Sequence, residues 1–384
     1  MPQKIPYWRL SGFYFSYFAF LGAFTPYWSL YLKSLDFSAF QIGILMSVLH
    51  VMRLFAPHFW GWQADRIGKR IGIVRMTALF SLLAYLGTFF GRDFLWLFAV
   101  MMLMNFFWSA NLPLVEATTL GHLDGKVGKY GAIRSWGSAG FVFSVIGIGY
   151  LLDHTPIAAL LWAILGFMIG TLLFSGRIPE AGNPPHVTDS VSVWSILGKS
   201  EVIALFASCL LMTAAHGPYY TFYSIYLVAH GYPKSSIGWL WGLGVICEIG
   251  VFFMMPKIMA RFSLKAILAF SLGCAALRFS LIGWAVDIPI LVILAQTLHA
   301  ATFGAHHAAA MAAIHHFFRG RYQARGQSFY TSLVYGAGGI LGALGGGYAW
   351  EAFGPEITFS LGSIAALAGL LWLLLKFRLS PGRS

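Results

Sequence analysis

The chain has 384 residues, of which 58% are hydrophobic and only 10% are charged, and its mean hydropathy is +0.73. This composition leaves too little polar surface to cover a soluble globule, so it excludes a soluble enzyme and predicts an integral membrane protein. The formal net charge of +12 does not require a nucleic-acid partner, because membrane proteins collect lysine and arginine in their cytoplasmic loops.

Twelve apolar stretches are each long enough for a membrane-spanning helix of about 20 residues. The sequence therefore predicts an all-α membrane protein with two six-helix halves, 1–175 and 200–384, joined by a cytoplasmic linker at 176–199. The predicted spans are 8–32, 38–62, 71–90, 94–122, 131–153, 156–175, 200–229, 235–258, 264–286, 288–317, 325–350 and 354–378.

Charge asymmetry predicts the orientation of these spans. With both termini in the cytoplasm, only Lys33, Arg92 and Lys234 of the 25 lysines and arginines lie outside, and three arginines lie within spans. The remaining 19 (25 − 3 − 3) then lie on the inner side, as the positive-inside rule requires. We expect a multi-pass protein of a bacterial inner membrane, with basic loops against the anionic leaflet.

The two halves share an internal repeat. Shifting residues 19–66 forward by 195 places the Tyr31-Leu32 pair on Tyr226-Leu227 and Arg66 on Arg261. A parallel duplication of this kind is typical of one large class of transporters, in which the substrate site lies between the halves near mid-membrane. The same shift places Arg53 on Glu248, and ionised residues inside apolar segments are candidate functional residues.

Aromatic residues gather on two spans that correspond under the repeat. We expect their rings either to line one cavity or to belong to the aromatic belts at the membrane surfaces. On the first span they are Tyr27, Trp28 and Tyr31, and on the seventh they are Tyr219, Tyr220, Tyr223 and Tyr226, beside His216.

Between the second and third spans lies a turn with the sequence Gly61-Trp-Gln-Ala-Asp65-Arg66-Ile-Gly68-Lys69-Arg70. Its glycines permit a tight turn and Asp65 is able to cap a helix N-terminus. The segment resembles the gating signature Gly-x-x-x-Asp-Arg-x-Gly-Arg/Lys of the major facilitator superfamily, at the place where that family carries it. The resemblance implies a transporter that works by alternating access.

Five charged residues lie inside the predicted spans: Arg53, Glu116, Arg134, Glu248 and Arg278. They are candidate functional residues, although ion pairs that only hold helices together remain an alternative. Three cations and two anions leave one positive charge, which an anionic substrate would balance. The cysteines Cys209, Cys247 and Cys274 are scattered in apolar spans, so we expect neither a disulfide framework nor a metal site.

Two of these charges resemble a known substrate site. Glu116 and Arg134, eighteen residues apart on the fourth and fifth spans, resemble the carboxylate and arginine with which lactose-permease-type symporters hold substrate. Glu248, Arg278 and His299 resemble the proton-coupling group of the same transporters. One departure is that Thr302 and Gln296 replace a carboxylate and a lysine, so the proton would be carried by Glu248, Glu116 or His299.

Over essentially its whole length the chain resembles the bacterial 3-phenylpropionate permease group, which is related to oligosaccharide and nucleoside proton symporters. The resemblance implies proton-linked import of a small aromatic carboxylate, with Arg53 or Arg134 binding the carboxylate and no cofactor. We expect the bilayer, protons and a small molecule as partners, and a monomer as the working unit. The alternatives are a sugar or nucleoside symporter and, in another class, a non-transporting membrane receptor.

Overall fold

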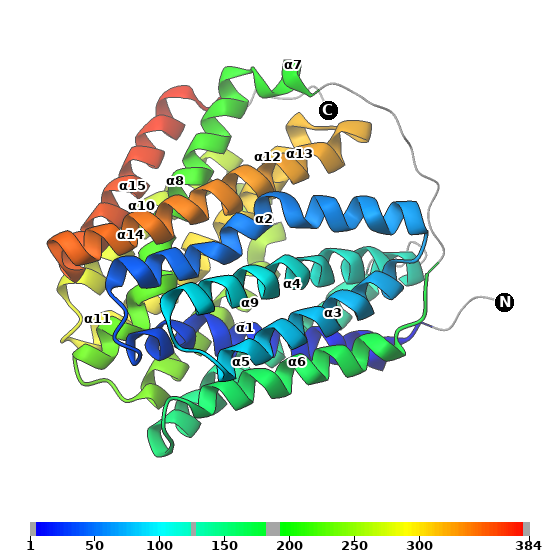
Figure 1. Ribbon diagram of the computed structural model, residues 1–384. Helices are drawn as coiled ribbons and strands as arrows, with labels where there is room; N and C mark the ends of the chain where they lie inside the picture. Colours follow the sequence, from blue (N-terminus) through cyan, green and yellow to red (C-terminus); the bar gives the residue numbers. More distant parts are fainter. Residues whose placement is uncertain (1–4, 124–127, 182–192, 379–384) are drawn as a thin grey trace. The chain divides into compact units, whose positions relative to one another are not determined.

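The computed structural model of the chain describes residues 5–123, 128–181 and 193–378, and the regular elements in these ranges are all helices (Figure 1). The chain divides into two compact units. The first unit comprises Met1–Val187 together with Tyr232–Gly242, and the second comprises Thr188–Gly231 and Leu243–Ser384. One helix, α9, is therefore shared between the two units.

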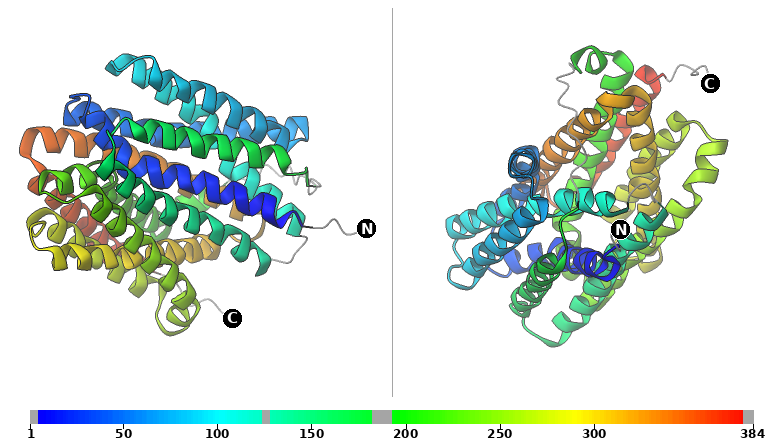
Figure 2. Two further views of the ribbon diagram at one scale, coloured as in Figure 1. Left: turned by 90° about the horizontal axis from the view of Figure 1, so that it is seen from below. Right: turned by 90° about the vertical axis from the view of Figure 1, so that its right-hand side faces the viewer.

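In the first unit, α1 is the central helix and packs against both α5 and α6. The further views in Figure 2 show α1 running between them. Helix α4 packs against α2 and α3, and α3 also contacts α6. The helices are α1 (Tyr7–Lys33), α2 (Ala39–Ile67), α3 (Arg70–Leu86), η1 (Gly87–Phe89), α4 (Phe94–Leu123), α5 (Gly128–His154) and α6 (Ala159–Arg177).

In the second unit, α8 packs against α14 and α15, and α15 packs against α10. Its helices, including the shared one, are α7 (Trp194–Leu197), α8 (Ser200–Ala229), α9 (Lys234–Arg261), α10 (Leu264–Trp284), α11 (Pro289–Thr297), η2 (Ala300–Ala305), α12 (His306–Phe317), η3 (Gly320–Tyr322), α13 (Gln323–Tyr330), η4 (Thr331–Ala337), α14 (Gly338–Phe353) and α15 (Pro355–Lys376).

Nine helices within the described ranges are long and apolar enough to cross a membrane. They coincide with nine of the predicted spans. The span predicted at 8–32 is the 27-residue helix α1, whose many tyrosines and serines lower its hydropathy. The spans predicted at 288–317 and 325–350 are helical runs that contain the π-helical segments η2 and η4. The count of twelve spans and the halves 1–175 and 200–384 stay predictions, and residues 182–192 of the linker lie outside the described residues.

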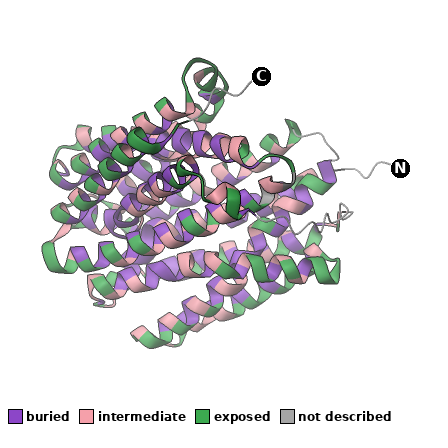
Figure 3. Cartoon of the chain, turned by 90° about the horizontal axis from the view of Figure 1, so that it is seen from above, coloured by how far each residue is buried: buried purple, intermediate pink, exposed green. Residues whose placement is uncertain are grey.

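The exposed residues fit a lipid environment. Figure 3 shows buried and exposed residues on the same helices, as expected when one face packs on neighbours. Many exposed side chains are large and apolar, among them Phe253, Leu95 and Trp162, which are 81%, 74% and 67% exposed. Such surface is costly in water and is compatible with lipid. The chain is accordingly a multi-pass membrane protein.

The first third of α9, residues 234–242, packs on α5 inside the first unit. A Cβ atom added at Gly238 would lie 2.5 Å from the carbonyl oxygen of Val145, so only glycine permits this approach. The carboxylate of Asp153 accepts hydrogen bonds from the backbone amides of Lys234 and Ser235, at 2.7 and 3.1 Å. It thereby satisfies two of the amides that a helix N-terminus leaves without intrahelical partners.

Close contact between α1 and α5 also depends on glycine. A Cβ atom at Gly140 would lie 2.2 Å from the backbone oxygen of Phe15, and one at Gly22 would lie 2.6 Å from that of Phe141. Small residues at helix contacts are the usual means of close packing in membranes, where van der Waals contact supplies much of the association energy.

We predict that Gly140→Ala lowers the melting temperature of the purified protein, because the added methyl group forces α1 and α5 apart. Overpacking of this kind costs about 1–3 kcal/mol. Gly147→Ala is the matched control on the same helix, since a Cβ atom there has no neighbour within 4 Å. Equal melting temperatures for the two variants would contradict the packing described here.

Candidate functional site

Glu116 on α4 and Arg134 on α5 form an ion pair in the first unit, with 3.5 Å between Arg134 Nε and Glu116 Oε1. The Tyr130 hydroxyl donates to the same carboxylate oxygen at 3.4 Å. The Arg134 guanidinium lies 4.0 Å from the centre of the Phe18 ring. Because the pair is about one-third exposed, it is accessible to a ligand.

Tyr17 on α1 is linked electrostatically to the three charged residues predicted inside the spans of the first unit. It lies within electrostatic range of Arg53, Glu116 and Arg134. Its ring stacks on the indole of Trp108, with 4.7 Å between centroids and an interplanar angle of 5°. Arg53 makes no hydrogen bond or ion pair with the described residues, so its guanidinium is the available cation of this cluster.

The predicted aromatic residues of the first span are buried against neighbouring helices. The Tyr27 hydroxyl donates to the Val145 carbonyl at 2.7 Å, and the Trp28 indole nitrogen lies 3.3 Å from the Met101 sulfur. Tyr31 is 3% exposed and its ring packs on Trp28. A role for Tyr27, Trp28 and Tyr31 in substrate binding stays a prediction.

Arg278 on α10 is the most enclosed charge of the second unit, with no exposed surface. Its Nε donates to the Ala295 carbonyl at 3.0 Å, and its terminal nitrogens donate to Thr302 Oγ1 at 3.2 Å and Gln296 Oε1 at 3.4 Å. Its guanidinium also lies 4.1 Å from the centre of the Tyr219 ring. These neutral partners satisfy most of its donors, which a buried cation requires.

His216 on α8 completes the surroundings of Arg278. Its Nδ1 lies 2.8 Å from the Met212 carbonyl oxygen, so Nδ1 carries the hydrogen. Its Nε2 lies 3.3 Å from both Arg278 Nη1 and Thr302 Oγ1 and accepts a hydrogen bond from them. This arrangement fixes a neutral imidazole, because a second proton would face the guanidinium. In this structure His216 supports Arg278, and its predicted contact with substrate stays a prediction.

Glu248 on α9 and His299 form the second pair of this unit, with 3.6 Å between the carboxylate and His299 Nε2. His299 Nδ1 is buried and has no hydrogen-bond partner among the described residues. A bare acceptor there costs less than an unsatisfied N–H, so the arrangement favours a neutral imidazole that presents Nε2–H to an ionised Glu248. The pair in this state is able to bind one more proton.

The remaining predicted aromatic residues of α8 lie beside both groups. Tyr220 stacks on His216 and is within electrostatic range of Arg278 and Glu248. Tyr223 is 1% exposed and its ring packs on Tyr219, with 4.9 Å between centroids. Tyr219 and Tyr220 therefore lie beside the charges of the second unit, whereas the Tyr226 hydroxyl donates to the Gly283 carbonyl at 2.8 Å.

A π-helical segment changes the face that follows His299. Seven residues of regular α-helix would place His306 on the same face, but η2 lies between them. The stack that starts at His299 continues instead through Phe303 to His307 at four-residue steps. His306 approaches Cys209 at 3.9 Å. The described residues contain no group of three or more histidine, cysteine or acidic residues arranged to hold a metal ion.

The predicted gating motif forms the end of α2 and the turn into α3. Gly68 adopts φ +71°, a left-handed conformation that favours glycine. The prediction that Asp65 caps a helix N-terminus is wrong, because Asp65 lies in the last turn of α2 and α3 begins after Lys69. Asp65 lies 4.0 Å from Arg70, and the Arg66 guanidinium lies 5.5 Å from the Trp62 ring centre. A Cβ atom at Gly61 would have open space around it. A role of the motif in gating stays a prediction.

Sequence reasoning missed Tyr17 and Trp108, since nothing separates them from many other aromatic residues of the chain. It also treated Gln296 and Thr302 only as departures from a known pattern, although both are partners of Arg278.

The comparisons with known proteins agree with this architecture. Residues 7–361 match the model of the MFS_1 like family. The "Probable 3-phenylpropionic acid transporter" of Escherichia coli is 30% identical over 95% of this chain and 96% of its own, and the "Maltose permease" of Geobacillus stearothermophilus is 26% identical over 94% and 92%. A crystal structure of a mutant of the nucleoside transporter NupG has a TM-score of 0.87 at 16% identity, covering 97% of this chain and 99% of that one.

The helical fold and the charged clusters within it define a membrane transporter of the major facilitator superfamily, and not an enzyme. Within that superfamily, the chain belongs to the MFS_1 like family.

We predict that Arg278→Lys destabilises the protein although the charge is kept. A lysine has one nitrogen and cannot donate to Ala295, Thr302 and Gln296 at once, so buried acceptors lose their partner. The expected loss is about 2–4 kcal/mol, measured as a lower midpoint of thermal unfolding.

The control for this variant is Arg261→Lys, which changes an exposed arginine at the end of α9 in the same way. Its melting temperature should match that of the unchanged protein. If Arg278→Lys melts at the same temperature as Arg261→Lys, the hydrogen bonds of Arg278 do not contribute measurably to the fold.

Proposed function

We propose that the protein is a proton-coupled symporter that imports a small organic monoanion, most simply an aromatic carboxylate such as 3-phenylpropionate, by alternating access. The bacterial inner membrane is its proposed location, with both termini in the cytoplasm and a monomer as the working unit. The observation that carries the proposal is the cluster of Arg53, Glu116 and Arg134 around the stacked rings of Tyr17 and Trp108.

The charge of this cluster supports an anionic substrate. Arg134 is paired with Glu116, whereas Arg53 has no such partner among the described residues, so two cations and one carboxylate leave one positive charge. A substrate carboxylate beside Arg53 would make charge-assisted hydrogen bonds that are stronger than neutral ones. The buried stack of Tyr17 on Trp108 forms the aromatic side of this cluster.

The proton is proposed to bind the Glu248–His299 pair. One added proton neutralises the carboxylate without a second unpaired charge in the apolar surroundings. Movement of one monoanion with one proton transfers no net charge. Coupling then arises if protonation of the pair favours one state of the transporter over the other.

A sugar or nucleoside symporter is the second candidate, and a specific observation favours it. Glu116 and Arg134 already neutralise each other, and such a pair is able to bind hydroxyl groups of an uncharged substrate through both partners. A maltose permease among the relatives is in keeping with this candidate.

Uptake into proteoliposomes tests the substrate. We expect labelled 3-phenylpropionate to accumulate on an inward proton gradient and not on an imposed voltage alone. Arg53→Gln should raise the half-saturating concentration about tenfold to a hundredfold, the effect of one lost charged hydrogen bond. Arg92→Gln, an exposed arginine, should have no effect.

Other outcomes of the uptake assay would replace the proposal. Accumulation of maltose or uridine without 3-phenylpropionate would favour the second candidate. Binding of ligands without any uptake would favour a receptor. Accumulation driven by voltage alone would exclude the electroneutral stoichiometry.

Glu248→Gln tests the proton site. We expect the variant to bind substrate and exchange it across the membrane at a rate close to normal, yet to lose accumulation against a gradient, because glutamine cannot bind and release the proton. Glu201→Gln, at the start of α8, is the matched control and should accumulate substrate normally.

If Glu248→Gln folds and still concentrates substrate on a pH gradient, the proton site is elsewhere, at Glu116 or His299. If the variant loses both exchange and thermal stability, Glu248 has only a packing role.

A further inference from the structure

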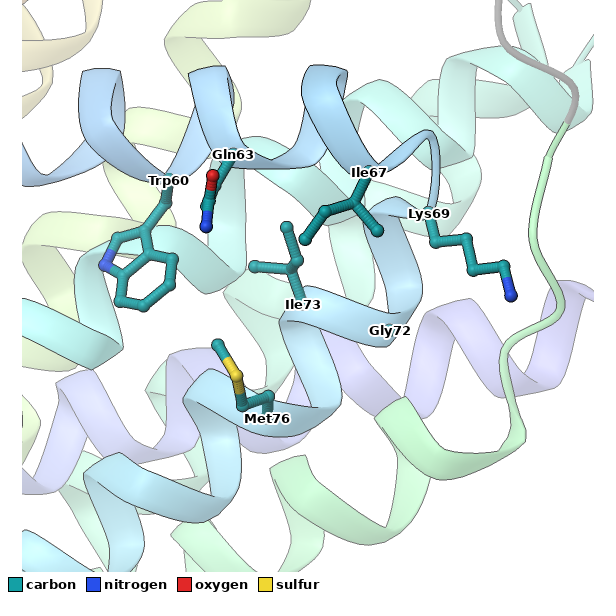
Figure 4. A pocket seen from close by; sticks show the side chains of 7 residues that line it. All are labelled: Trp60, Gln63, Ile67, Lys69, Gly72, Ile73 and Met76. Atoms are coloured by element: carbon teal, nitrogen blue, oxygen red, sulfur yellow. The ribbon is translucent and has the colours of Figure 1, made fainter.

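A cavity of about 220 Å³ lies between α2 and α3 of the first unit, next to the turn that joins them. Figure 4 shows Trp60, Gln63 and Ile67 on α2 facing Ile73 and Met76 on α3 across this space. Its lining includes Gln63, Ile67 and Lys69 of the predicted gating motif but none of the residues of the charged cluster around Tyr17.

Most of the cavity lining is hydrocarbon. The side chains of Trp60, Ile67, Ile73 and Met76 supply the apolar surface, and Ile67 and Met76 are 53% and 36% exposed at its rim. Both helices are candidate membrane spans, so the rim faces the surroundings in which lipid chains lie. An apolar chain of a lipid would cover this surface, whereas water or a small inorganic ion would leave it poorly covered.

Two polar side chains line the cavity, Lys69 and Gln63, and the first of them is a cation. Lys69, which begins α3, makes no ion pair with the residues that the structure describes, so its ammonium group is available. Figure 4 shows the side-chain amide nitrogen of Gln63 pointing into the space. The oxygen of the same amide is buried and has no hydrogen-bond partner in the described part of the chain. The protein therefore does not satisfy all the hydrogen-bonding groups of this side chain by itself.

The surrounding charges restrict the kind of anion. Glu180 accepts a hydrogen bond from the backbone amide of Gly72 at 3.0 Å, which places a carboxylate beside the cavity. Arg70 is close to Asp65, and Arg66 lies by the Trp62 ring. A headgroup with one phosphodiester charge matches the single available cation of the cavity lining, Lys69, better than a dianion does.

We propose that this cavity binds one anionic phospholipid of the leaflet next to the basic loops. Lys69, at the turn end of the cavity, contacts the phosphate, the amide of Gln63 lies deeper along α2, toward the glycerol esters, and an acyl chain covers Trp60, Ile67, Ile73 and Met76. The site depends on the protein being embedded in a bilayer and is independent of the transported substrate. Juxtamembrane lysines attract anionic lipid in general, and the cavity adds a defined place for one chain.

Native mass spectrometry of the purified full-length protein tests the site, with phosphatidylglycerol as the probe. Gly72→Phe fills the cavity, since a Cβ atom at Gly72 has only Lys69 Cβ nearby, at 3.7 Å. Gly61→Phe is its control, because Gly61 also has open space but does not line the cavity. Lys69→Gln removes the cation, and Lys257→Gln, at an exposed position of α9, is the charge-matched control.

We expect Gly72→Phe and Lys69→Gln each to lower the fraction of protein carrying one phosphatidylglycerol at least fivefold, and the two controls to leave it unchanged. The unchanged protein should bind phosphatidylcholine at least fivefold less, and glycerol 3-phosphate, which lacks acyl chains, should not compete. If Gly72→Phe does not fold, the lysine pair decides the question.

Three results would overturn the proposal. Undiminished phosphatidylglycerol binding to folded Gly72→Phe, or to Lys69→Gln if the glycine variant does not fold, would place the lipid elsewhere. Equal binding of phosphatidylcholine would show that the headgroup charge is not recognised. Competition by glycerol 3-phosphate at the same concentration would identify a site for small phosphates and not for a lipid.

Discussion

The need to give a guanidinium its hydrogen-bond acceptors shapes the surroundings of Arg134 and Arg278. An arginine cannot lose its proton in a protein, so each buried donor must find an acceptor. Arg134 meets this requirement with the Glu116 carboxylate and the face of Phe18. Arg278 meets it through Ala295, Thr302 and Gln296, none of which contributes a carboxylate. Each arginine thus has acceptors among its neighbours, a carboxylate in one case and neutral oxygens in the other.

The surroundings of Arg134 and Arg278 differ in how far they are exposed. The pair in the first unit is about one-third exposed and has a second arginine, Arg53, in the same cluster. The arginine in the second unit is fully enclosed, and the Glu248–His299 pair of the same unit is able to take up a proton. The first unit thus holds a partly exposed pair with a second arginine, and the second unit holds a buried arginine beside the Glu248–His299 pair, the proposed proton site. The internal repeat carries the same contrast, since Arg53 and Glu248 occupy equivalent positions.

Length and apolar composition predicted the long helices, because a spanning segment must be both long and apolar. The Ser38–Gln41 capping box begins α2, and Gly68 in a left-handed conformation ends it. Both signals depend only on residues close together in the sequence. The Glu116–Arg134 pairing was predictable from resemblance. The partners of Arg278 were not, since Gln296 and Thr302 are neutral and only long-range packing brings them to the guanidinium.

The π-helical segments were also beyond sequence reasoning. A fixed step of 3.6 residues predicts which side chains share a face, and η2 breaks that step directly after His299. The consequence is that His307, not His306, continues the stack from His299.

Helix α9 is one continuous helix whose residues up to Gly242 belong to the first unit and whose remaining residues belong to the second. Glu248 lies six residues beyond that division, or about 9 Å along the axis at 1.5 Å per residue. At the start of the helix, Asp153 binds its first amides. A rotation or bend of α9 caused by neutralising Glu248 would therefore reach its anchored end through a single continuous element, with no loop in between to absorb it.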